Sequence, residues 1–394
     1  MKPIRVLEII SGFAIEGPLG GIERFGMALA QALDRSLVEP VVCGLWAYDT
    51  PYERGWVEHL RAQGIDAFIA ADWSEEDPYG SFVQAIKGMR AYVHKPVDVI
   101  HSHCQFGDVA ALWLKRPFRA TSLLRTVHNE REWGKRPLRR YLLTNGLYPL
   151  LFAQELGVAQ TVVDNLNRRP IARLLHRQAV RAYNALDVQR FADVQVDRAA
   201  LRAELGLPVD AFVVGSIGRL VEQKGYRILL TAVPAILAQL PQTHVVIVGD
   251  GEQREALQAQ AQALQVNDHV HFTGPRRDVE ALIQTFDLFV APSLWEGLPT
   301  VIMESMAAGV PVVATAVSGT QELIQHQKTG YLVPAHSPEA LAAAIVKFDG
   351  METAVKHTIT TNARHFVQQN FSIQAVARQH EQIYSLFHPD NPVD

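Results

Sequence analysis

The chain has 394 residues, more than the roughly 250 to 300 at which single compact cores stop growing, so its length predicts two domains. Its composition, 48% hydrophobic and 20% charged with a net charge of -4, is that of a globular protein and disfavours a nucleic-acid partner. The two cysteines are too few for a disulfide framework or a metal cluster, which favours a reducing compartment such as the cytoplasm.

The first half alternates short apolar runs with longer amphipathic stretches. In chain order, IRVLEII is predicted to be a strand, GIERFGMALAQALD a helix and VEPVVCGL a strand, followed later by the strand candidates VDVIHSH and ATSLLRTVHN. This alternation predicts βαβ units and a parallel sheet. The first run is interpreted as a strand and not as a leader peptide, because Glu8 interrupts it and no small-residue cleavage site follows.

The second half repeats the pattern. Its strand candidates are FVVGSIGRL, HVVIVGDG, VHFTG, LFVAPS and VPVVAT, which predict a second doubly wound sheet. The predicted domains are residues 1–186 and 187–370, and the helix and tail at 371–394 are expected to pack on the first domain. No apolar run reaches the about 18 residues that span a bilayer, so a soluble or peripheral protein is expected.

Two glutamates interrupt the apolar stretch PSLWEGLPTVIMESMAAGVPVVAT. Glu296 is predicted in a loop at the start of a helix that Pro299 begins and Gly309 ends, and Glu304 on that helix. A carboxylate near a helix start is favoured by the helix dipole, which is the structural explanation for Glu296. Glu304 lies among apolar residues, where a carboxylate needs partners, and it suits a ligand with paired hydroxyls such as a ribose or a hexose.

Three glycine-containing turns follow predicted strands. In GSIGRLVEQKG, Arg219 and Lys224 precede a helix, an arrangement that suits phosphate, although a solvated basic loop is the alternative. PLGGIERF and VIVGDGEQ are weaker signals. The glycines of PLGGIERF allow close approach to a ligand, and those of VIVGDGEQ serve either a tight turn or a nucleotide.

Together with VHFTGPRRDVEALIQTF and GYLVP, these motifs resemble the family four, or group one, retaining glycosyltransferases of the GT-B fold. The resemblance is dense over about residues 211 to 335 and sparse in the N-terminal half. It implies two Rossmann-like domains that face each other across a cleft, the first for the acceptor and the second for the nucleotide sugar. It also implies transfer of a hexose from a UDP- or GDP-sugar to a glycan, lipid-linked or small-molecule acceptor, with retention of configuration. No Asp-x-Asp motif follows a predicted strand, so no metal or other cofactor is expected.

The resemblance assigns roles to individual residues. Arg219 and Lys224 would hold the leaving diphosphate, Glu304 the ribose hydroxyls and Glu296 the donor sugar. His103, the second histidine of VDVIHSH, would lie near the anomeric centre, whereas the structural alternative is a histidine satisfied at a strand end. The other implied donor-binding positions are Gly20, Gly21, Gly218, Gly249, Gly251, Arg277, Gly297, Leu298, Pro299 and Thr300.

Two further histidines and two departures from the family pattern qualify these roles. His101 is expected on the same side of its strand as His103 but deeper, and His128 beside the cleft. Ala185 replaces a common glycine near the domain crossing, which predicts a stiffer hinge. Pro299 lacks the amide hydrogen that many relatives have, and the hydroxyl of Thr300 is expected to substitute.

The charge is unevenly distributed. From Lys115 to Arg181 there are 14 lysines and arginines against four acidic residues. Basic residues beside Trp133, Tyr141 and Leu142 would suit an anionic membrane surface or a phosphorylated acceptor, and the alternative is a solvated helical face.

Other functions stay open on the sequence. The alternatives are a phosphorylase or nucleotide-sugar epimerase of the same fold, and a non-catalytic nucleotide-binding module. The set of Arg219, Lys224, Glu296 and Glu304 favours an enzyme over the non-catalytic module.

Overall fold

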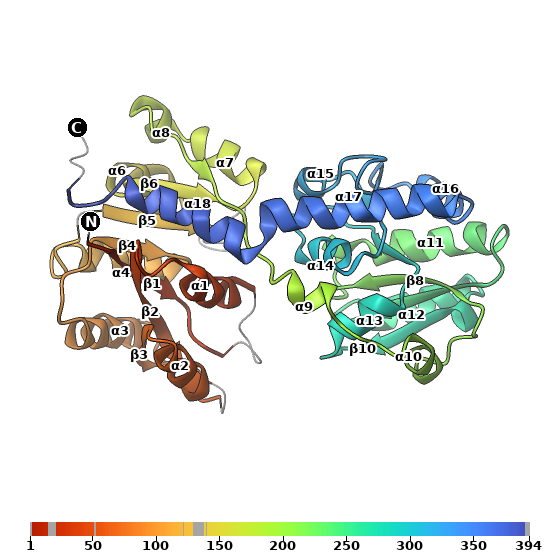
Figure 1. Ribbon diagram of the computed structural model, residues 1–394, viewed down its shortest axis with the longest axis horizontal. Helices are drawn as coiled ribbons and strands as arrows, with labels where there is room; N and C mark the ends of the chain where they lie inside the picture. The colour runs from red at the N-terminus through yellow and green to blue at the C-terminus, as the bar shows by residue number, and fades with distance from the viewer. Residues whose placement is uncertain are drawn as a thin grey trace. The chain divides into compact units, whose positions relative to one another are not determined.

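The computed structural model describes residues 2–14, 21–50, 53–120, 122–128, 138 and 140–390. The chain divides into two compact units (Figure 1). Unit 1 consists of Met1–Ala185 together with Ile373–Asp394, and unit 2 of Leu186–Ser372.

Unit 1 is built on a parallel sheet that has seven strands in the described residues, in the order β3-β2-β1-β4-β5-β6-β7. The strands are β1 Ile4–Ile10, β2 Val38–Ala47, β3 Asp66–Asp72, β4 Val99–Ser102, β5 Ser122–Val127, β6 Gln154–Gly157 and β7 Val180–Arg181. The strand order reverses between β1 and β4, which is the point where open parallel sheets bind ligands beyond the carboxyl ends of their strands.

The helices of unit 1 cover this sheet and form a separate group near its β6 and β7 edge (Figure 1). They are α1 Gly21–Ala32, α2 Glu53–Ala62, α3 Pro78–Tyr92, α4 Gln105–Leu114, the π-helix η1 Arg140–Leu147, α6 Tyr148–Leu151, α7 Gln160–Asn167, α8 Pro170–Leu174 and α18 Ile373–Ser385. The last of these, α18, packs against α1.

Alternation along β1 decides which side chains meet which helices. Leu7 and Ile9 join the apolar core that also contains residues of α3 and α4. Ile4 and Val6 point to the opposite face and join the core shared with α1 and α18. Glu8 has the same parity as Ile4 and Val6, so the strand delivers a carboxylate into an otherwise apolar layer.

Unit 2 repeats the architecture with a parallel sheet of six described strands in the order β10-β9-β8-β11-β12-β13. The strands are β8 Phe212–Ile217, β9 Thr243–Val248, β10 Val270–Gly274, β11 Leu288–Ala291, β12 Val312–Thr315 and β13 Tyr331–Val333. The strand order reverses between β8 and β11. The predicted pair of doubly wound α/β sheets is confirmed.

The helices of unit 2 follow its strands in sequence. They are α9 Gln189–Ala192, α10 Arg198–Glu204, the 3-10 turn η2 Glu222–Lys224, α11 Tyr226–Leu237, α12 Arg254–Ala263, η3 Asn267–His269, α13 Val279–Thr285, α14 Thr300–Ala308, α15 Ser318–Leu323, α16 Pro338–Asp349 and α17 Thr353–Phe371. None of the helices in the described parts of either unit is long and apolar enough to cross a bilayer.

Candidate functional site

The turn after β8 carries the predicted phosphate-binding cations of unit 2. Arg219 is exposed in this turn, and Lys224 is the last residue of η2. Gly225 follows with a φ of 65°, and a Cβ at this position would lie 2.0 Å from the carbonyl oxygen of Pro292. Because a side chain would collide with that backbone, glycine is what allows the turn to pack against the loop after β11.

That packing joins Lys224 to Glu296. The Lys224 Nζ lies 2.6 Å from the Glu296 Oε1, and the Ser293 Oγ donates a hydrogen bond of 2.7 Å to the same oxygen. Glu296 is 7% exposed and Lys224 20%. The family resemblance assigns these two side chains to different parts of one ligand. The structure brings them into direct contact, so Glu296 also orients the ammonium group of Lys224 at the strand-order reversal.

Glu304 is half-buried in the second turn of α14. The sequence placed the start of this helix at Pro299. In the structure Pro299 is its N-cap, Thr300 its first residue, and Gly309 ends it with a φ of 76°. The carboxylates of Glu296 and Glu304 therefore come from a loop and a helix respectively, as predicted.

The loop of Gly297, Leu298 and Pro299 rests on α15. The Ser318 Oγ donates a hydrogen bond of 2.8 Å to the carbonyl oxygen of Glu296. A Cβ on Gly319 would lie 1.6 Å from the carbonyl oxygen of Gly297. Ser318 and Gly319 support the site and were missed in the sequence, because their contacts come from residues about 22 positions earlier.

The glycines after β9 pack against the turn after β8. A Cβ on Gly249 would lie 2.0 Å from the carbonyl oxygen of Gly218, and one on Gly251 would lie 2.5 Å from that of Leu220. These contacts support the tight-turn alternative for both glycines. The glycines act on the site indirectly, by holding the backbone that carries Arg219.

Arg277 lies exposed in the loop after β10, and its side chain forms no ion pair with another described residue. Its neighbour Arg276 is bound instead, to Asp278 at 2.7 Å and Glu204 at 2.8 Å. Of the two arginines in the GPRRD sequence, the structure thus assigns Arg276 to the fold and leaves Arg277 accessible.

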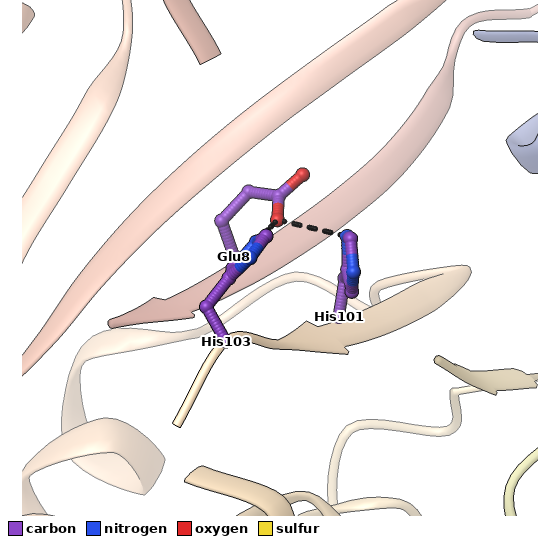
Figure 2. A group of neighbouring side chains, drawn as sticks. All are labelled: Glu8, His101 and His103. Atoms are coloured by element: carbon purple, nitrogen blue, oxygen red, sulfur yellow. Dashed lines mark hydrogen bonds and ion pairs between the residues drawn. The ribbon is translucent and has the colours of Figure 1, made fainter. Parts of the chain in front are cut away.

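A second cluster lies at the strand-order reversal of unit 1. Figure 2 shows Glu8 between the imidazoles of His101 and His103. The Glu8 Oε2 is 2.8 Å from the His103 Nε2 and 3.2 Å from the His101 Nδ1, and all three side chains are fully buried. Of the remaining predicted positions in this unit, Gly21 is the first residue of α1 and Gly20 lies outside the described residues.

Helix α18 completes this cluster. The Tyr384 hydroxyl donates a hydrogen bond of 2.7 Å to the Glu8 Oε1 and lies 2.7 Å from the His101 Nδ1. The other nitrogen of His101 lies 2.8 Å from the Thr126 Oγ1. Both nitrogens of His101 are therefore engaged within the fold, in agreement with its predicted deeper position.

The contact with Glu8 fixes the state of His103. Burial, followed by repulsion from His101, lowers the pKa of His103, although the hydrogen bond to Glu8 opposes this shift. Burial alone would raise the pKa of Glu8, but His101 and His103 together hold it well below its usual range. A neutral His103 that donates from Nε2 to the Glu8 carboxylate keeps its Nδ1 as a hydrogen-bond acceptor. In the described residues that Nδ1 has no partner.

His103 lines a cavity of about 250 Å³ within unit 1, together with His128, Arg125 and Asp108. The Arg125 guanidinium is buried and pairs with Asp108 at 2.9 Å and Glu155 at 3.0 Å. The cavity therefore offers imidazole nitrogens beside a buried charged pair, groups that suit a ligand with several hydroxyls. Arg125 was missed in the sequence because it stands inside the apolar strand β5.

Comparison with known proteins identifies the second unit. Residues 197–366 match the family model described as glycosyl transferases group 1. This match includes the turn with Arg219 and Lys224, the loop with Glu296, and α14 with Glu304. Over residues 197–366 the chain is similar to the glycosyl transferases group 1 family.

Two curated relatives each match less than half of the chain. The lipopolysaccharide core biosynthesis glycosyltransferase LpsE of Rhizobium meliloti is 40% identical over 144 residues, which cover 36% of this chain and 41% of LpsE. The UDP-Gal:alpha-D-GlcNAc-diphosphoundecaprenol alpha-1,3-galactosyltransferase of Escherichia coli is 28% identical over 194 residues, 48% of this chain and 49% of that enzyme. The chain thus matches less than half the length of these two relatives.

The whole chain resembles solved structures. The crystal structure of HepE from Anabaena in complex with UDP and glucose covers 97% of this chain and is itself covered to 99%, with a TM-score of 0.77 and 22% identity. At this identity the likeness shows a shared fold, the GT-B fold that the sequence predicts.

Proposed function

We propose that the chain is a retaining group 1 glycosyltransferase that moves a hexose from a UDP- or GDP-sugar to a glycan, lipid-linked or small-molecule acceptor. In this proposal unit 2 binds the donor and unit 1 the acceptor. The observation that carries it is the coincidence of the family match with the ion pair of Lys224 and Glu296 at the strand-order reversal of unit 2.

The proposed chemistry follows from the charge of the leaving group. A nucleoside diphosphate gains negative charge as it departs, and cations held at that place stabilise the transition state. Lys224 is held there by Glu296, and Arg219 is accessible in the same turn. Glu304 would accept hydrogen bonds from the ribose hydroxyls, and Glu296 would accept from the donor sugar through the oxygen that Lys224 does not engage.

The proposed role of His103 follows from its tautomer. Because the Nε2–H of neutral His103 donates its hydrogen bond to Glu8, the Nδ1 can accept a hydrogen bond from a hydroxyl of the transferred sugar or of the acceptor. The names of relatives support the range of acceptors. The E. coli relative is named for a lipid-linked acceptor and LpsE for the lipopolysaccharide core.

Substitution of the two cations tests the proposal. Arg219→Ala and Lys224→Ala should each lower release of the nucleoside diphosphate by about a hundredfold to a thousandfold, as removal of a transition-state stabiliser does. Turnover is measured on the full chain with a panel of nucleotide sugars, and thermal unfolding verifies that each variant is folded. Arg227→Ala, an exposed arginine on α11, is the matched control and should retain activity. Undiminished turnover in both test variants would refute the assignment, and sugar release that requires orthophosphate would identify a phosphorylase.

We further propose that the reaction needs no metal ion. Arg219 and Lys224 supply fixed cations for the diphosphate. Among the described residues, the three side chains grouped closely enough to hold an ion are Glu8, His101 and His103, and both imidazoles contact the Glu8 carboxylate. That group contains two nitrogen ligands and one carboxylate, unlike the oxygen-rich sites that magnesium prefers. Activity should therefore survive EDTA, and the product should keep the donor's anomeric configuration by NMR. Loss of activity that manganese restores would disprove this proposal.

A further inference from the structure

Large apolar side chains are exposed on one part of unit 1. On η1 these are Tyr141, Leu142 and Leu147, on α6 Leu150 and Leu151, and on α8 Leu174. Tyr141 is 68% exposed, Leu142 58% and Leu174 77%. Single exposed leucines are common on protein surfaces, but a group on neighbouring elements marks an interaction site. We refer to these six side chains as the leucine patch.

The elements that carry the leucine patch form one substructure. Helix α6 continues directly from η1, and α8 packs against both. Arg169, which precedes α8, donates from Nη1 to the carbonyl oxygen of Thr144 in η1 at 2.6 Å. Tyr148 and Pro149 are buried beneath the surface, so the substructure is anchored while its leucines remain outside.

The charge around the leucine patch is positive. Arg168, Arg173 and Arg177 are exposed on and beside α8. Between residues 140 and 180 the acidic residues are Glu155, which is buried against Arg125 and Arg169, and Asp164, which is half-buried. The exposed surface thus combines aliphatic side chains with guanidinium groups and has little acidic charge to oppose them.

We propose that the leucine patch docks unit 1 on an anionic lipid bilayer. Leucine and tyrosine side chains would enter the boundary between headgroups and acyl chains, and the arginines would meet the lipid phosphates. The charge complementarity favours this occupant over a second copy of the chain, because two such surfaces would bring their arginines together. The purpose of docking rests on the proposed function, since a lipid-linked acceptor is presented at a bilayer.

Vesicle flotation tests the docking. The full chain should bind vesicles of phosphatidylcholine with phosphatidylglycerol and bind pure phosphatidylcholine vesicles weakly. Replacement of two exposed leucines, L150Q with L174Q, should lower the bound fraction about tenfold or more, because burial of each leucine at the bilayer boundary contributes to binding. The matched control is L37Q with L386Q, two exposed leucines elsewhere in unit 1, which should bind like the unchanged chain.

The arginines are tested separately. Replacement of two exposed arginines, R173E with R177E, should also reduce binding, and salt should diminish the difference, because exposed charges are screened over about 8 Å at physiological ionic strength. Nucleotide binding should be equal in all variants. Flotation does not require a nucleotide, so a failed glycosyltransferase assignment would leave vesicle binding unchanged.

Three results would overturn the docking proposal. The first is an unchanged chain that does not float with anionic vesicles, and the second is equal binding of the leucine variant and its control. The third is a dimer in solution, seen by light scattering, that the leucine variant dissociates while vesicle binding is absent. That result would make the leucine patch an interface between copies.

Discussion

Glu8 is the acceptor that satisfies three buried side chains, His101, His103 and Tyr384. Replacement by alanine removes the carboxylate and leaves these three buried side chains without their charged acceptor. Glu8→Ala should therefore lower the free energy of unfolding by about 3 to 5 kcal/mol. Urea denaturation measures this loss. Glu58→Ala, which removes an exposed carboxylate from α2, should change stability by less than about 0.5 kcal/mol. Equal stability of the two variants would show that the buried cluster contributes little to the fold.

His380 on α18 makes unit 1 sensitive to acid. Burial, followed by repulsion from His101, lowers its pKa from 6.5 to about 3. Between these two values the unfolded chain binds more protons at this residue than the folded one, so stability rises with pH and is lost as pH falls below about 6.5. A single such group contributes about 1.4 kcal/mol for each pH unit in that window.

Urea denaturation between about pH 6.5 and 5 tests this effect, because Glu8 does not titrate in that range. The stability of His380→Gln should fall less steeply with acid than that of the unchanged chain, and His365→Gln, at an exposed position, should follow the unchanged chain. Parallel slopes for all three proteins would mean that His380 is not held neutral by the fold.

Sequence reasoning found site residues where local pattern carries the information. Arg219 and Lys224 stand in one turn, and Glu296 and Glu304 bracket the start of one helix, so each pair is visible in a short window. The partners of those residues are not local. Tyr384 meets Glu8 across 376 positions, and Lys224 meets Glu296 across 72. No periodicity connects such positions, so the sequence could supply the members of each cluster but not their pairing.

At the scale of elements, Gly225 joins η2 to the loop after β11. Gly225→Ala should destabilise the chain by about 1 to 3 kcal/mol more than Gly206→Ala, because both glycines have a positive φ but only a Cβ at Gly225 would collide with backbone, whereas one at Gly206 would meet no atom within 4 Å. Gly225→Ala should also weaken nucleotide binding, since it displaces Lys224. Urea denaturation and nucleotide titration measure the two effects. Equal losses in both variants would indicate that the contact with Pro292 is not required.

The elements themselves were predictable where alternation and helix boundaries are strong. The strand candidates before each ligand loop correspond to β1, β4, β8, β9 and β11. The π-helix η1 was not predictable, because the structure leaves two of its three leucines exposed and an amphipathic pattern expects apolar side chains to be buried. The exposed apolar side chains that make η1 hard to predict belong to the leucine patch of the docking proposal.

At the scale of the molecule, repetition of strand and helix predicted two doubly wound sheets. The strand orders, which decide where each site lies, come from pairing between segments distant in the chain, such as β1 with β4 and β8 with β11. Once the strand orders are known, the positions of the two sites can be inferred, because the loops that follow the two central strands lie together where the order reverses. In unit 2 these loops bear Lys224 and Glu296, and in unit 1 Glu8 and His103 lie on and beside the two central strands.

The central claim is that unit 2 binds a nucleotide sugar through Glu304 and the two cations. Isothermal titration of the full chain with UDP, GDP and ADP tests it most directly, with Glu304→Ala as the test variant and the exposed Glu255→Ala as its control. We predict that UDP or GDP binds, and that Glu304→Ala weakens binding by about tenfold to a hundredfold, since hydrogen bonds to charged groups are worth about 1.5 to 3 kcal/mol. The control should bind like the unchanged chain. Absence of binding by all three nucleotides, or equal affinities of Glu304→Ala and Glu255→Ala, would contradict the claim.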